Sequence, residues 1–107
     1  MIPIVFIHGF GGGSYEFQPI IKYLKKRGIS KFYEFTYKEN FGRISLRLIA
    51  KKFEKFVNKT VKEKKITIIG MSQGGIIARL FLKHQKQKKL INALHYALHI
   101  MDLLWAI

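Results

Sequence analysis

Residues 70–75 read Gly-Met-Ser-Gln-Gly-Gly and directly follow an apolar run at 65–69, Lys-Ile-Thr-Ile-Ile. A β-branched run that leads into G-x-S-x-G, with a helical pattern after it, predicts a strand that turns sharply into a helix. In such a turn, side chains at Gly70 and Gly74 would collide, and Ser72 would occupy a strained backbone conformation. The pattern predicts that Ser72 presents its hydroxyl at an exposed corner as a nucleophile. The alternative is a glycine-rich turn with an incidental serine.

A second glycine-rich loop follows the first apolar run of the chain. Residues 1–7 read Met-Ile-Pro-Ile-Val-Phe-Ile, and residues 8–14 read His-Gly-Phe-Gly-Gly-Gly-Ser. Attack of a serine on an ester carbonyl forms an oxyanion, which preorganised backbone N–H groups stabilise. We predict that Gln73, just after the serine, supplies one such N–H group and that Phe10 supplies the other. The alternative is a phosphate cradle, but the loop has neither G-x-x-x-x-G-K-[ST] nor G-x-G-x-x-G.

These two segments, in this order and about sixty residues apart, resemble the N-terminal half of an α/β-hydrolase of the lipase/esterase type. Residues 4–12 are similar to the family's H-G-x-x-G oxyanion loop. Residues 68–79 are similar to its G-H-S-M-G-G-x-x-A-R elbow, with Met71 and Gln73 in place of the commoner His and Met. The resemblance covers residues 1 to about 90 and implies a carboxylic ester hydrolase that acts on an ester or lipid without a cofactor. It also implies structural roles at the site for His8, Gly9, Gly11, Gly70, Gly74 and Gly75.

The segments between and after these loops predict the order β-α-β-α-β-α. Apolar residues recur at helical spacing over 14–28, where Ser14 is a plausible N-cap, and again over 41–64, where lysines fill the opposite face. Residues 31–37 alternate like a strand, and residues 73 to about 84 continue from the serine as a helix. Right-handed crossovers then give an α/β fold, a truncated α/β-hydrolase with a three-stranded parallel sheet flanked by helices.

The chain is short and strongly basic, with 107 residues and a net charge of +14. It is one domain, whereas a complete α/β-hydrolase commonly needs on the order of 200 residues or more. The lysines lie mostly on the solvent faces of two predicted helices, without a recognition motif, so a solvated surface is favoured and nucleic acid is not. An anionic membrane surface remains a candidate partner, and a non-enzymatic basic module that binds such a membrane or a partner protein is the alternative function.

The absence of cysteine excludes disulfides and thiol catalysis. The N-terminus runs into a strand without a charged n-region or a cleavage site, so we predict a cytoplasmic protein, with peripheral membrane association left open.

The catalytic partners of the serine do not follow the order that this family uses, which is Ser, then Asp or Glu, then His. After Ser72 the only acid is Asp102, and His84, His95 and His99 all precede it. We therefore predict an incomplete triad whose general base is unknown, in a chain inactive by itself. The alternative is a base recruited from a partner chain or from His95 or His99. The last two histidines and Asp102 would share one helical face, but such clusters on apolar helices often arise by chance, so we predict no metal.

The last stretch, residues 90–107, is apolar but interrupted by polar residues, which predicts an interfacial or partner-seeking helix or a disordered tail rather than a membrane span. If the reading frame of the codons for residues 94–106 is moved back by one nucleotide and the third bases are chosen freely, the displaced codons can encode I-T-L-C-T-P-H-Y-G-S-P-M-G. That string resembles the strand and T-P-H-x-G-S loop that follow the elbow helix in this family. We therefore treat 1–93 as family-like and hypothesise that 94–107 is an out-of-frame tail, which would leave the strand at 65–70 with an open edge.

Overall fold

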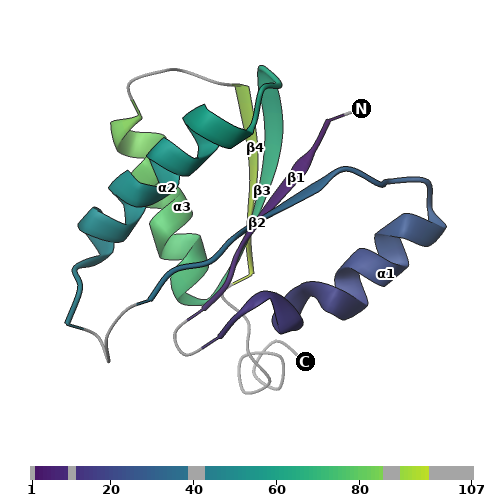
Figure 1. Ribbon diagram of the computed structural model, residues 1–107, viewed down its shortest axis with the longest axis horizontal. Coiled ribbons are helices and arrows are strands. Elements are labelled where there is room, and N and C mark those ends of the chain that lie inside the picture. Colours follow the sequence, from purple (N-terminus) through teal and green to yellow (C-terminus); the bar gives the residue numbers. More distant parts are fainter. Residues whose placement is uncertain (1, 10–11, 39–42, 86–89, 97–107) are drawn as a thin grey trace.

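Four parallel strands form one sheet in the order β2-β1-β3-β4 (Figure 1). The computed structural model describes residues 2–9, 12–38, 43–85 and 90–96. The strands are β1 (Ile4–Ile7), β2 (Phe32–Phe35), β3 (Lys65–Met71) and β4 (Leu90–Tyr96). Each neighbouring pair runs parallel, so the predicted α/β class with a parallel sheet is confirmed.

Helices cover both faces of the sheet. Helix α1 (Gln18–Lys26), preceded by the 3₁₀ turn η1 (Ser14–Phe17), lies on one face. Helices α2 (Leu46–Thr60) and α3 (Gln73–His84) lie together on the other face (Figure 1). The predicted alternation of strands and helices is therefore confirmed as far as α3. Within the described residues, no helix is both long enough and apolar enough to cross a bilayer.

The central strand β1 explains why the core is built in two clusters. All four of its residues are buried. Ile4 and Phe6 pack with residues of η1 and α1, whereas Val5 and Ile7 pack with residues of α2 and α3. Side chains alternate between the faces of a strand, so a strand that is covered on both faces needs an apolar residue at every position.

The ends of the helices depart from the predicted ends for local reasons. Residues 14–17 form a 3₁₀ turn, and α1 begins only at Gln18, with a proline in its first turn. It ends before Gly28, whose φ of +88° is left-handed. Helix α2 is shorter than the predicted 41–64, because the extended residue Ser45 caps it by accepting a hydrogen bond from Leu48 N–H, and Val61 is again extended.

The sheet has one strand more than the three predicted. Residues 90–96 were expected to belong to an apolar helix or an irregular tail, but they pair with β3 along its whole length, from Lys65↔Leu90 to Met71↔Tyr96. The expected open edge of β3 is therefore covered by β4. A short apolar run does not distinguish strand from helix by its pattern, and here the unpaired backbone groups of β3 favour the strand. The remainder of the predicted tail, 97–107, lies outside the described residues.

Candidate active site

The turn between β3 and α3 holds Ser72 in a strained conformation. Its φ of 53° and ψ of −116° make it the only non-glycine residue with positive φ in the described part of the chain. A non-glycine residue in such a region costs on the order of 1–3 kcal/mol. The strand ends at Met71 and the helix begins at Gln73, so a single residue makes the whole change of direction. The structure thus places Ser72 at the corner that the sequence pattern predicts.

Two glycines allow the strand and helix to approach this closely. A Cβ atom added at Gly70 would lie 2.6 Å from the carbonyl of Gly74 and the nitrogen of Gly75. A Cβ atom added at Gly74 would overlap the carbonyl oxygen of Ile7 and lie 2.7 Å from that of His8. Because all of these neighbours are backbone atoms, they cannot rotate away. The collision predicted for Gly70 and Gly74 is confirmed, and the start of α3 rests directly on the end of β1.

The first glycine-rich loop lies against the serine. A Cβ atom on Gly9 would be 3.0 Å from the oxygen of Met71 and 3.3 Å from Cβ of Ser72. The two loops therefore meet, although they are far apart in the sequence. Phe10 and Gly11, predicted as oxyanion donor and loop glycine, lie outside the described residues.

This meeting point is where the topology of the sheet favours a ligand. From β1 the chain crosses through α1 to β2 on one side, and from β2 it crosses back through α2 to β3 on the other. The connections that follow β1 and β3 therefore leave in opposite directions and open a crevice at the carboxyl ends of the strands, where open α/β sheets bind ligands. An open cavity of about 640 Å³ lies at the carboxyl ends of β1 and β2 and is bordered by His8, Tyr37 and Lys52. Ser72 is not among its lining residues.

The side chain of His8 is fully engaged in supporting the loop. It is 2% exposed, and its ring stacks on that of Tyr37 with the centroids 4.2 Å apart. The backbone N–H of Tyr37 donates to Nε2 at 3.2 Å, so the ring proton is assigned to Nδ1, which donates to the oxygen of Gly9 at 2.8 Å. Both ring nitrogens are occupied, which leaves neither to accept a proton from Ser72.

Tyr37 connects the two loops, and the sequence analysis missed it. Its hydroxyl donates to the carbonyl oxygen of His8 at 2.9 Å and accepts from Nε2 of Gln73 at 3.1 Å. The side chain of Gln73, predicted only to contribute its backbone N–H, thereby ties the first turn of α3 to β1 and β2. One signal was available, since Tyr37 follows the carboxyl end of β2, the edge at which α/β proteins place functional groups.

Glu16 is a second residue that the sequence analysis missed. Its Oε2 accepts a hydrogen bond of 3.4 Å from the backbone N–H of Gly9. A Cβ atom on Gly12 would overlap the same carboxylate, and Gly12 N–H donates to the oxygen of Gly9 at 3.0 Å. The carboxylate therefore closes around the loop and occupies the N–H of Gly9.

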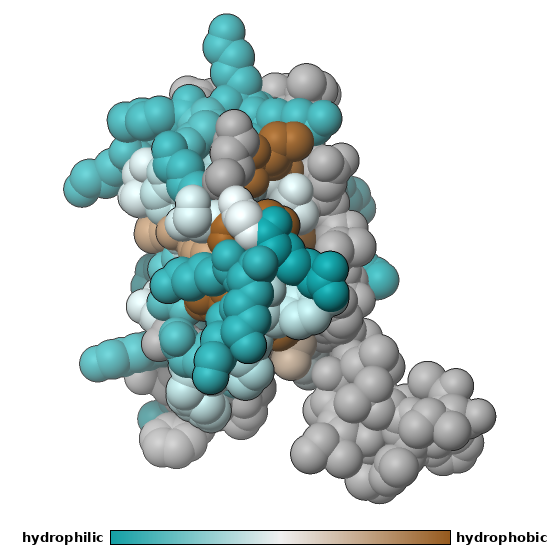
Figure 2. Space-filling model, turned by 90° about the vertical axis from the view of Figure 1, so that its right-hand side faces the viewer, coloured by the Kyte–Doolittle hydropathy of each residue, from teal (hydrophilic) through white to brown (hydrophobic). Residues whose placement is uncertain are grey.

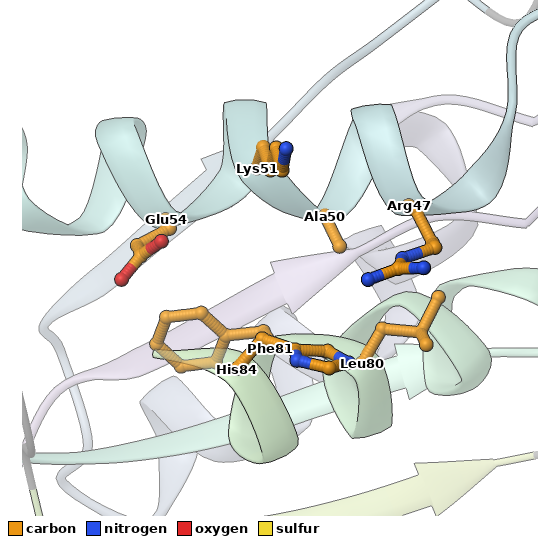
Figure 3. A pocket seen from close by; sticks show the side chains of 7 residues that line it. All are labelled: Arg47, Ala50, Lys51, Glu54, Leu80, Phe81 and His84. Atoms are coloured by element: carbon orange, nitrogen blue, oxygen red, sulfur yellow. The ribbon is translucent and has the colours of Figure 1, made fainter. Parts of the chain in front are cut away.

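His84 is too distant to act on Ser72. It is the last residue of α3, a 12-residue helix, and a rise of 1.5 Å per residue puts it about 18 Å from the serine. Its side chain lines a small cavity of about 90 Å³ between α2 and α3, together with Leu80 and with Arg47 from the facing helix (Figure 3). His84 is therefore excluded as a general base.

The other candidate partners are only partly placed. In the register of β4, His95 pairs with Gly70, so its backbone lies close to the serine turn. His95 belongs to a strand, so the prediction that it shares a helical face with His99 and Asp102 is wrong for His95. His99 and Asp102 lie outside the described residues. Among the residues that are described, no three His, Cys, Asp or Glu side chains gather as metal ligands.

Comparison with known proteins agrees with this arrangement. Residues 1–100 match the family described as Lipase (class 2). The matched segment runs from β1 to β4 and contains the serine turn and the glycine-rich loop that lies against it. No curated protein matches the chain. Since the family match covers far more than half of the sequence and includes the residues that meet around Ser72, the chain belongs to the class 2 lipase family.

Proposed function

We propose that the protein carries the acyl-transfer site of a carboxylic ester hydrolase, with Ser72 as nucleophile. The observation that carries the proposal is the conformation of Ser72, a strained residue between β3 and α3 with the glycine-rich loop against it. This position sets the half-buried Ser72 at the carboxyl edge of the sheet, where a nucleophile elbow presents its hydroxyl to a ligand. Attack of Oγ on an ester carbonyl, with the serine proton passing to a base, would form a tetrahedral intermediate. Its collapse would break the bond to the alcohol, which takes up that proton, and water would then hydrolyse the acyl-serine.

Backbone N–H groups from two sides would stabilise the oxyanion of that intermediate. Gln73 begins α3, and the first N–H groups of a helix have no intrahelical acceptor and carry partial positive charge. On the other side, the N–H of Gly9 is held by Glu16 and that of Gly12 by the oxygen of Gly9. The resemblance of residues 4–12 to the family's oxyanion loop assigns the donor role to the N–H of Phe10. Loss of one such donor typically costs a factor of about 10²–10³ in turnover.

The proposed site lacks an assigned general base. His8 has both ring nitrogens engaged, and His84 lies at the far end of α3. We therefore propose that the triad is incomplete in this chain, so that Ser72 reacts slowly unless His95, His99 or a partner supplies a base. Oxyanion donors and binding alone leave about 10³–10⁴-fold catalysis over water in a serine protease that has lost its triad.

Covalent labelling tests the proposal directly. The chain is treated with a fluorophosphonate, with and without added imidazole as an external base, and the labelled peptide is identified by mass spectrometry. We expect slow labelling at Ser72 that imidazole accelerates, no labelling of that peptide in Ser72→Ala, and unchanged labelling in Ser45→Ala, whose serine caps α2. Labelling at another residue, or none even with imidazole, would show that Ser72 is not a nucleophile.

A further inference from the structure

An open groove of about 500 Å³ runs between α1 and the sheet, on the face away from α2 and α3. The helix contributes Ile20, Tyr23 and Leu24 to its walls. The strands contribute Ile4, Thr67 and Ile69. The walls are almost entirely apolar, and Tyr23 is 54% exposed at the edge of the groove. This face of the molecule therefore presents a concave apolar site next to an exposed aromatic ring.

Cationic residues neighbour Tyr23 in the sequence, and one of them lies over its ring. Lys22 precedes Tyr23, and Lys26 and Arg27 follow it by three and four residues, a spacing that brings them to the same side of the helix. The guanidinium of Arg27 lies 4.5 Å from the centroid of the Tyr23 ring. Helix α1 contains no acidic residue. Figure 2 looks at the side of the molecule where α1 lies and shows hydrophilic side chains with hydrophobic atoms visible between them.

This combination matches the chemistry of a lipid surface. The dipole of α1 accounts for cations in its last turn, but it gives no reason for an exposed tyrosine beside an apolar groove. Tyrosine has an apolar body and a polar tip that suit the boundary between acyl chains and water. Lysine and arginine lay their stems along apolar surface while their charges reach phosphate groups. The charge complement of such a surface is an anionic headgroup.

We propose that α1 docks the protein on bilayers that contain anionic phospholipid. Tyr23 and the groove contact the acyl boundary, and Lys22, Lys26 and Arg27 pair with lipid phosphates. The proposal goes beyond ester hydrolysis, because docking requires no reaction at Ser72.

The first test compares equal losses of charge on opposite faces of the sheet. The whole chain is sedimented with vesicles of diether phosphatidylcholine that contain or lack diether phosphatidylglycerol, lipids that have no ester to hydrolyse. The variant K22Q/K26Q/R27Q removes three cations from α1 and its C-cap residue, and K51Q/K55Q/K59Q removes three exposed lysines from α2. Each cation near an anionic surface strengthens binding about fivefold. We expect the α1 variant to bind the anionic vesicles on the order of a hundredfold more weakly, and the α2 variant to lose less than about tenfold.

The second test removes the apolar contact without changing charge. Tyr23→Ser is compared with Leu48→Ser, which removes a side chain that is 47% exposed on α2. We expect Tyr23→Ser to weaken binding by about tenfold and to make the remaining binding fade more steeply with salt. We expect Leu48→Ser to match the unaltered chain.

Three results would overturn the proposal. Equal losses from the two triple variants would indicate attraction by net charge alone. Equal behaviour of the two serine variants would mean that the groove takes no part. Self-association that Tyr23→Ser abolishes, without binding to anionic vesicles, would assign the groove to a second copy of the chain. Because the lipids carry no ester, none of these results depends on whether Ser72 is a nucleophile.

Discussion

The hydroxyl of Tyr37 is expected to hold the two loops of the candidate site together, and Tyr37→Phe tests this by removing one atom. The substitution deletes the bond that Tyr37 donates to the oxygen of His8 and the bond that it accepts from Gln73. It retains the ring that stacks on His8 and the backbone N–H that donates to Nε2. Any effect can therefore be assigned to the hydroxyl rather than to lost packing.

The size of the effect follows from two partly buried hydrogen bonds. Each contributes a net of about 0.5–1.5 kcal/mol to stability, so that the two together contribute about 1–3 kcal/mol. Because part of the ring is exposed, we expect a value in the lower part of that range. We expect Tyr37→Phe to lower the free energy of unfolding by about 1–2 kcal/mol, measured from urea unfolding curves. Tyr15→Phe is the control, because Tyr15 is 68% exposed, and it should change stability by less than about 0.5 kcal/mol.

A double-mutant cycle isolates the link between the loops. Gln73→Met keeps the length of the side chain but removes the donor to Tyr37. The cycle of Tyr37→Phe and Gln73→Met should give a coupling energy of about 0.5–1 kcal/mol, since the two side chains share one bond. A coupling energy near zero, or a Tyr37→Phe variant as stable as Tyr15→Phe, would refute the idea that this hydroxyl joins the serine turn to β1 and β2.

Three further predictions concern stability. Gly74→Ala should cost about 3 kcal/mol or more in urea unfolding, because its Cβ would overlap the carbonyl oxygen of Ile7; a variant with the original midpoint would contradict this. Ser45→Ala should cost about 1 kcal/mol through loss of the α2 cap, again by urea unfolding. A hydrogen bond from Lys31 lowers the pKa of Glu63 from 4.5 in the folded chain. The stability that this pair contributes is therefore complete above pH 4.5 and is lost as pH falls through the lowered pKa of the folded state. The unfolding midpoint of Glu63→Gln should be less sensitive to acid than that of the unaltered chain, and an unchanged pH dependence would argue against this role of the pair.

The parts of the fold that sequence patterns could predict are those governed by local rules. The run at 4–7 and the buried positions of 65–71 are apolar because they lie inside a sheet. Glycine is required at 70 and 74 because an added Cβ atom would lie within 2.8 Å of backbone atoms. Such constraints allow one residue type or one class of residue at each position. The strained serine can be recognised from the sequence because the glycines that its turn requires stand on either side of it.

The parts that could not be predicted depend on contacts between distant segments. The strand at 90–96 has a pattern that suits helix or strand, and only the free edge of β3 decides between them. Glu16 is an ordinary acid near a helix start until the fold brings it to Gly9. Tyr37 is likewise an ordinary strand-end aromatic residue until it meets His8 and Gln73.

The conformation of Ser72 bears on whether folding or chemistry explains a serine at this position. A turn with φ of 53° and ψ of −116° would be less strained with glycine, and glycines already stand at 70, 74 and 75. A serine there costs stability on the order of 1–3 kcal/mol. Backbone geometry alone would therefore favour glycine at this corner. The proposed role of Ser72 as a nucleophile would account for a strained serine beside the start of α3 and against Gly9.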